Sequence, residues 1–179
     1  MKGIGFFMAM VFTIFLHDLK AQEGYREIGL RLTDFNSLNF IYKKQLYENI
    51  YKRYRVVAGN FQIRIKDEFL LNTNLGLAIG KEKRKDIAER LQFVHGWEPA
   101  VFAGFSKNDT DFVLSGNINL GYVLGFQYNA SEKFVVSLEA IPYFGVYASY
   151  TDSGLDPVAV QGGISNNAAA ITVVYRFFR

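Results

Sequence analysis

Hydrophobic and polar residues alternate with a period of two along most of the chain, which is typical of β-strands that bury one face. The alternation is clearest over 117–128. One face there carries Ile118, Leu120, Tyr122, Leu124, Phe126 and Tyr128, and the other carries Asn117, Asn119, Gly121, Val123, Gly125 and Gln127. The same pattern occurs over 71–80 and, less sharply, over 169–178, without sustained stripes of period 3.6. The sequence therefore predicts an all-β fold.

A short motif repeats three times and organises the predicted strands. It consists of an apolar or small residue, any residue, Glu, a polar residue and a large apolar residue, and it is centred on Glu48, Glu89 and Glu132, 41 and 43 residues apart. An interval of this length holds two strands and two connections, so the motif is expected at every second turn of an antiparallel meander. A pattern this short can also recur by chance, but the even spacing favours a structural repeat.

Counting from these turns predicts eight strands. They are expected at residues 25–33, 37–45, 50–64, 69–80, 90–105, 112–128, 133–150 and 166–179. The other connections fall at 34–36, 65–68, 106–111 and 151–165. An even number of strands places both termini and the three Glu turns at one end, called the near end below. The other four connections lie at the far end, and no internal domain boundary is apparent.

The first residues have the pattern of a signal peptide. Lys2 precedes fourteen residues without a charge, from residue 3 to residue 16, and a spanning helix needs about 20 such residues. We therefore expect cleavage after Ala21, so that 1–21 is a signal peptide and 22–179 is the mature domain. The alternative is an N-terminal anchor helix, although His17, Asp18 and Lys20 end the apolar run early.

Composition excludes several classes of protein. Half of the residues are hydrophobic, which excludes a disordered chain, and the absence of Cys excludes disulfides, lipoprotein anchoring, thiolate metal sites and a cysteine nucleophile. The net charge of +3 is too small and too evenly spread to argue for a nucleic-acid partner. The 17 Phe and 11 Tyr exceed what one soluble core of this size usually needs.

The distribution of charge separates two kinds of barrel. Alternation alone fits both a soluble barrel and a membrane barrel with the opposite polarity. Residues 112–131 and 158–175 carry no charge on either face, and their less bulky faces hold Gly, Asn, Ser, Thr, Ala and Gln. Small residues and amides suit a narrow lumen, so the bulky faces are expected to meet lipid and the sheet to close on itself.

Aromatic residues near the predicted strand ends match the girdles at the two membrane interfaces. They are Tyr25, Tyr42, Tyr54, Phe69, Phe93, Phe105, Phe112, Tyr128, Phe134, Tyr150, Tyr175 and Phe177. The alternative is that these side chains fill the core of a soluble barrel, and Trp97 is compatible with either arrangement.

In architecture the chain resembles small outer-membrane β-barrels of the OmpA/OmpX type and the barrels of the Bacteroidetes group. The resemblance covers the mature chain and includes an aromatic C-terminal strand, 173–179, together with the stretches 40–44 and 51–55. It implies an eight-stranded antiparallel up-and-down transmembrane barrel in the outer membrane, in contact with lipid and lipopolysaccharide. It also implies that the C-terminal strand carries the signal recognised by the barrel-assembly machinery. This strand ends on Arg179, whereas such families usually end on an aromatic residue.

Six charged residues fall on the predicted lumen faces: Glu27, Arg31, Arg53, Arg55, Glu98 and Glu139. Opposite charges in a narrow interior are expected to pair, because an unpaired buried charge is costly. The pairs would form a structural plug that closes the bore. The alternative is a gate or a polar conduit for small solutes, although an eight-stranded barrel has little room beyond its own side chains.

The sequence offers little support for catalysis, for a cofactor or for a metal site. His95 is the one His after the predicted cleavage site, and the lipid A deacylases of similar architecture require a Ser two residues after their His, where this chain has Trp97. The charged run 81–85 is assigned to a near-end turn. We therefore expect a non-enzymatic barrel with a structural, surface-contact or narrow permeation role. The alternatives are a barrel enzyme that modifies lipids and a secreted soluble barrel that binds an apolar ligand.

Overall fold

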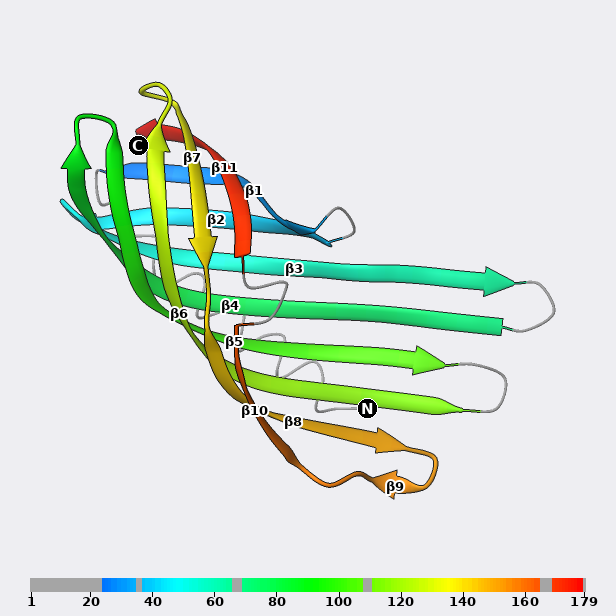
Figure 1. The fold of residues 1–179 in the computed structure, drawn as a ribbon. Helices are drawn as coiled ribbons and strands as arrows, with labels where there is room; N and C mark the ends of the chain where they lie inside the picture. Colours follow the sequence, from blue (N-terminus) through cyan, green and yellow to red (C-terminus); the bar gives the residue numbers. More distant parts are fainter. Residues whose placement is uncertain (1–23, 35–36, 66–68, 108–110, 165–168, 179) are drawn as a thin grey trace.

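A computed structural model describes residues 24–34, 37–65, 69–107, 111–164 and 169–178. These residues form one antiparallel sheet of eleven strands (Figure 1). The strands are β1 (Tyr25–Asp34), β2 (Ser37–Tyr47), β3 (Ile50–Ile65), β4 (Phe69–Ala88), β5 (Leu91–Lys107), β6 (Phe112–Asn129), β7 (Phe134–Ala140), β8 (Tyr143–Thr151), β9 (Gly154–Leu155), β10 (Ala159–Gly163) and β11 (Ala169–Phe178). The described residues include no helix capable of crossing a membrane.

The sheet closes into a barrel with eight strand positions. Consecutive strands pair from β1 to β6, and β1 pairs with β11 to close the barrel. β7 and β8 share one position, because both pair with β6 on the same side and are separated by Ile141 and Pro142. β10 and β11 share another, since β10 pairs with β8 and β11 pairs with β7. The predicted eight-stranded antiparallel barrel is confirmed.

Proline accounts for the break between β7 and β8. Pro142 has no N–H to donate to a neighbouring strand, so the ladder is interrupted at this position. The Pro142 carbonyl still accepts a hydrogen bond from the Tyr122 amide at 2.9 Å, and pairing resumes with Gly121 opposite Tyr143. β7 and β8 therefore both run antiparallel to β6.

The near end has the arrangement expected from the sequence. Turns at 48–49, 89–90 and 130–133 lie at this end, together with the start of β1 and the end of β11. Two assignments were wrong. β4 continues to Ala88 rather than ending at residue 80, so 81–85 is part of a strand and not of a turn. At the far end, the predicted connection 151–165 contains the short strands β9 and β10. The predicted signal peptide, 1–21, lies outside the described residues.

The barrel is longer on one side than on the other. β3, β4, β5 and β6 contain 16, 20, 17 and 18 residues, whereas β1, β2 and β11 contain 10, 11 and 10. Figure 1 shows the long strands extending side by side beyond the ends of β1 and β2. The far end is therefore bordered by a wall of four strands.

The outer surface is apolar and the interior carries charge. Large hydrophobic side chains are exposed on every barrel position, including Leu75 at 60%, Ile118 at 66% and Phe144 at 62%. The fully buried side chains include Arg31, Arg53 and Glu139. A soluble barrel would have the reverse polarity, because exposed apolar surface is costly in water and buried charge is costly in a core. The predicted inverted polarity is confirmed.

Gly96 is required where β5 approaches β4. A Cβ atom at this position would overlap the Lys81 carbonyl oxygen and lie 2.8 Å from the Glu82 Cα. We therefore expect Gly96→Ala to lower the free energy of unfolding by about 1–3 kcal/mol, the usual range for overpacking. Urea titration of the folded protein in lipid vesicles measures the change. Gly116→Ala is the matched control, because its nearest neighbour would be the Phe102 carbonyl oxygen at 3.8 Å. Equal stability of the two variants would contradict the prediction.

Candidate functional site

The charged interior is built by strand alternation. In the part of the chain that the structure describes, ten charged side chains on seven strands point inward and form ion pairs with one another: Glu27, Arg31, Lys43, Arg53, Arg55, Glu82, Arg84, Glu98, Glu139 and Arg176. We call this set the lumen cluster. Of the eight strand positions that the structure describes, only that of β6 contributes none of them, and the inward face of β6 offers Gly121, Gly125 and Gln127 instead. Small residues on β6 leave room for the long side chains that cross the lumen.

The middle of the cluster is organised around two carboxylates and the guanidinium between them. Arg53 lies 2.9 Å from an oxygen of Glu82 and 2.9 Å from an oxygen of Glu139. Lys43 bridges the same two carboxylates, at 3.0 Å from Glu82 and 3.4 Å from Glu139. Arg31 also pairs with Glu139, at 2.8 Å, and the Ser137 hydroxyl donates a hydrogen bond to Glu139 at 3.1 Å. All five charged side chains are fully buried, so these three cations and two carboxylates interact with one another, and Arg53 also with Glu98, rather than with solvent.

Near-end pairs extend the cluster toward the short turns. Arg84 donates two hydrogen bonds to Glu27, at 2.9 and 2.7 Å, and Arg176 donates a third at 2.8 Å. Arg84 also bonds Glu82 and lies over the ring of Tyr51, with 3.5 Å between the guanidinium carbon and the ring centre. Bidentate contacts hold a guanidinium in one orientation. The near half of the lumen is thus filled by fixed side chains.

The far side of the cluster ends at Glu98. Arg55 donates two hydrogen bonds to one carboxylate oxygen of Glu98, at 2.7 and 3.0 Å. The other oxygen lies 2.7 Å from Arg53 Nε, as an ion pair without hydrogen-bond geometry. Arg55 remains partly exposed, unlike Arg53. It therefore marks the point where the packed lumen gives way to open space.

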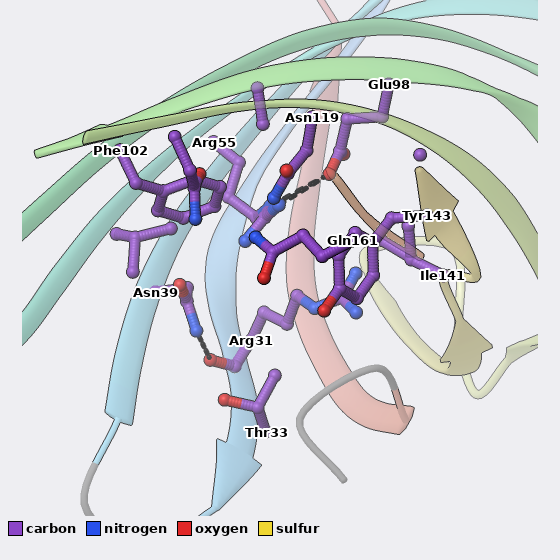
Figure 2. Close-up of a pocket in the computed structure, with 14 residues that line it drawn as sticks. Arg31, Thr33, Asn39, Arg55, Glu98, Phe102, Asn119, Ile141, Tyr143 and Gln161 are labelled. Carbon is purple, nitrogen blue, oxygen red and sulfur yellow. Dashed lines mark hydrogen bonds and ion pairs between the residues drawn. The ribbon is translucent and has the colours of Figure 1, made fainter. Parts of the chain in front are cut away.

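A polar cavity of about 290 Å³ lies on the far side of this point. Figure 2 shows Arg55 and Glu98 joined by an ion pair at its border, with Asn39, Asn119 and Gln161 directed into the same space. Further lining residues are Arg31, Thr33, Val57, Ala100, Phe102, Asn117, Gly121, Ile141 and Tyr143. Arg31, Arg55 and Glu98 belong to both the cavity and the lumen cluster, so the cavity ends where the cluster begins.

The cavity lies beside the one place where the described strands do not surround the lumen. β10 is at the end of the strand order, with β8 as its partner in the described part of the chain. Gln161 of β10 and Thr33 of β1 both line the cavity, although no register pairs these two strands. The far half of the lumen is therefore more open than the near half, where β1 and β11 are paired.

All six charged residues predicted for the lumen are inside the barrel. The structure brings five of them together, since Arg31, Arg53 and Arg55 contact Glu98 or Glu139. Glu27 is the exception, because it pairs with Arg84 and Arg176. The prediction missed Lys43, Glu82, Arg84 and Arg176. Continuing the alternation of β4 past residue 80 would have placed Glu82 and Arg84 on the same face as Ala78.

His95 is not part of the lumen cluster. It lies on the outer face of β5, where its Nδ1 is 3.0 Å from the hydroxyl of Tyr122 and its ring stacks on Phe93. The described residues contain no group of three or more His, Asp or Glu side chains arranged to hold a metal ion.

Comparison with known proteins finds likeness among solved structures. No family model matches the chain, and no curated protein matches it. Among solved structures, the chain is similar to Ail, the attachment invasion locus protein of Yersinia pestis, with a TM-score of 0.47 and 18% identity over 87% of this chain and 100% of that one. No residue role follows from a likeness of this size. The evidence for a barrel is the strand pairing of this chain and the distribution of its apolar and charged side chains.

Proposed function

We propose that this protein is an integral outer-membrane β-barrel without catalytic activity, whose lumen is closed by ion pairs and whose role is structural. The observation that supports this proposal is the lumen cluster inside an apolar outer surface. A bilayer offers no water to backbone groups, and a closed sheet satisfies them internally. Barrels of this kind place short turns toward the periplasm. The near end is accordingly the periplasmic end, and the far end is the surface available for contacts.

The cluster favours a closed lumen over a permeation pathway. A solute that entered the far-end cavity would reach Arg55 and Glu98 and then the buried contacts of Arg53 with Glu82 and Glu139. Separating those groups would leave buried charges without partners, which costs several kcal/mol per ion, of the order of 3–5 kcal/mol when one partner is removed. The cavity therefore ends blindly, and permeation of small solutes is the weaker alternative.

The proposal includes the partners expected of such a barrel. The exposed aliphatic and aromatic side chains fit contact with outer-membrane lipid and lipopolysaccharide. β11 ends with Tyr175, Phe177 and Phe178, which suits recognition by the barrel-assembly machinery. The position of His95 beside Tyr122 on the outer face, away from the acids of the lumen, supports a non-enzymatic role over a lipid-modifying enzyme.

Cell fractionation tests the proposed location. We expect the protein in the outer-membrane fraction, soluble only after detergent extraction, and migrating faster on a gel before boiling than after it. The shift arises because a closed barrel resists unfolding by detergent at room temperature. Recovery in the soluble fraction with the same mobility before and after boiling would contradict the proposal and favour a secreted soluble barrel.

A further inference from the structure

Short side chains create the polar cavity on the far side of the lumen cluster. One row of directly paired residues crosses five strands there: Arg55 of β3, Ala78 of β4, Ala100 of β5, Asn119 of β6 and Gly145 of β8. Directly opposed residues of antiparallel strands share a face, so the whole row faces the lumen. Alanine and glycine supply no long side chain to cross the lumen at this level, and a space of about 290 Å³ remains.

Three asparagine side chains bring buried hydrogen-bond acceptors to this cavity. Asn39 of β2 and Asn117 and Asn119 of β6 line it, and Asn39 is only 2% exposed. The side-chain oxygen of each is buried and accepts no hydrogen bond from any residue that the structure describes. The Asn39 NH2 group donates to the Arg31 carbonyl at 3.4 Å, and Figure 2 shows the amide directed into the cavity. Buried polar atoms are rarely left without a partner, so these oxygens fit a bound molecule that donates hydrogen bonds.

Arg55 adds hydrogen-bond donors to the same space. Its Nε and one terminal nitrogen donate to Glu98, at 3.0 and 2.7 Å, whereas a guanidinium carries five N–H groups in all. The Arg55 side chain is 11% exposed, so its remaining N–H groups are accessible to a ligand. The charged residues that line the described part of the cavity, Arg31, Arg55 and Glu98, are all engaged in ion pairs. A neutral ligand therefore fits this cavity better than an anion.

Two aromatic side chains give the cavity its apolar surface. Phe102 of β5 and Tyr143 of β8 line it, and Figure 2 shows them on opposite sides of the space. The Phe102 ring packs on Gly76 of β4, where a Cβ atom would overlap the ring, so the lack of a side chain at Gly76 gives the ring its place. Ligand pockets typically combine apolar surface of this kind with a few polar groups that fix the orientation of the ligand.

We propose that the far-end cavity binds a neutral sugar, as a single pyranose ring. Hydroxyl groups both donate and accept, so they match the oxygens of Asn39 and Asn117 together with the N–H groups of Arg55. The C–H groups on the faces of the ring would pack against Phe102 and Tyr143. The cavity volume of about 290 Å³ is at the lower end of ligand pockets, which start near 300 Å³, so it suits one ring rather than a chain of sugars. This inference adds a ligand to the proposed structural role and does not require the lumen to conduct.

Saturation-transfer NMR of the folded protein in lauryldimethylamine oxide micelles, a detergent without a sugar headgroup, tests the inference. The probes are the methyl pyranosides of glucose, galactose, mannose and N-acetylglucosamine, and we expect at least one of them to bind. The double variant Asn39→Ala, Asn117→Ala should weaken that binding by about tenfold or more, because each lost hydrogen bond weakens binding by about threefold to tenfold. Ala100→Leu should abolish binding, because Ala100 is buried and lines the cavity, so that a larger side chain there fills it.

Each variant has a matched control elsewhere in the chain. Asn49→Ala makes the same change as in the double variant at an exposed position of a near-end turn. Ala103→Leu enlarges an exposed alanine on the outer face of β5, three residues from Ala100. Both control variants should bind the glycoside like the wild type. The heat-dependent mobility shift shows for every variant whether the barrel is folded.

The outcomes separate this inference from the proposed function. Binding of none of the four glycosides by the wild type would overturn the inference, as would binding of inorganic phosphate in their place. Unchanged glycoside binding in a folded Ala100→Leu barrel or in the folded double variant would also overturn it. Disaccharides that end in the bound sugar distinguish its source: binding of the disaccharide supports the terminal unit of a glycan, and binding of the methyl glycoside alone supports a free monosaccharide. Failure of the wild type to show the mobility shift would contradict the proposed function itself.

Discussion

Glu139→Gln is expected to lower the free energy of unfolding by about 3–5 kcal/mol, the range for removing one partner of a buried ion pair. Glu139 accepts hydrogen bonds from Arg31 at 2.8 Å, from Arg53 at 2.9 Å and from Ser137 at 3.1 Å, and Lys43 lies 3.4 Å away. Glutamine keeps the size of the side chain but removes its charge. Three buried cations would then share the remaining carboxylates, and an amide NH2 would face one of them.

Urea titration in phosphatidylcholine vesicles measures this loss, with the gel mobility shift as the readout of the folded barrel. Glu132→Gln is the matched control, because Glu132 lies exposed in the near-end turn between β6 and β7. It should change the stability by no more than about 0.5 kcal/mol, as is usual for surface substitutions. Two variants of equal stability would show that the ion pairs of Glu139 do not hold the lumen together.

Arg53→Ala is expected to open the lumen to ions. Arg53 is the central cation of the cluster, within 2.9 Å of both Glu82 and Glu139 and within 2.7 Å of Glu98. Its removal creates a void in the middle of the lumen cluster and leaves three carboxylates with fewer counter-charges. We expect single-channel steps in planar bilayers for the variant, selective for cations, and a wild type that is silent under the same conditions.

The exposed Arg90 provides the control for this conductance experiment. It lies in the near-end turn between β4 and β5, so Arg90→Ala removes the same side chain without touching the lumen. That variant should be as silent as the wild type. A folded Arg53→Ala barrel without conductance would contradict closure by Arg53. A wild type that conducts small ions would favour the permeation role instead.

The fold was predictable because lipid and lumen impose opposite demands on alternate residues. Over 117–128 the bulky side chains fall on one face and the small or polar ones on the other. In the structure β6 has the same alternation of exposed and buried side chains. The near-end turns were predictable for the same reason, since each motif centred on Glu48, Glu89 or Glu132 interrupts the alternation with polar residues. Both the strands and the near-end turns were predictable from differences in hydropathy between neighbouring residues.

The near half of β4 was misassigned because the difference in hydropathy between its two faces disappears there. Lys81, Lys83 and Lys85 face outward while Glu82 and Arg84 face inward, so both faces are charged and hydropathy does not distinguish a strand from a turn. The outward lysines are compatible with a strand only where the membrane surface begins. Recognising them therefore requires the positions of the neighbouring strands, which a single sequence does not supply.

The choice of partners inside the lumen was not predictable either. Alternation assigns a residue to the inner face but does not give the stagger between strands, which sets the height of each residue in the barrel. Glu27 meets Arg84, 57 residues away, and Arg176, 149 residues away, rather than any of the other five predicted residues. The break at Pro142 and the separate strand β10 likewise follow from pairing rather than from periodicity.

The fluorescence of the single tryptophan tests most directly whether the barrel faces lipid with its apolar surface. Trp97 is 57% exposed on the outer face of β5, one position from the buried Glu98. In vesicles of lipids brominated near the headgroup end of the acyl chains, Trp97 emission is expected to be strongly quenched, and aqueous iodide is expected to quench it weakly. A Trp97→Phe variant supplies the blank. Strong quenching by iodide together with none by the brominated lipids would contradict the inverted barrel.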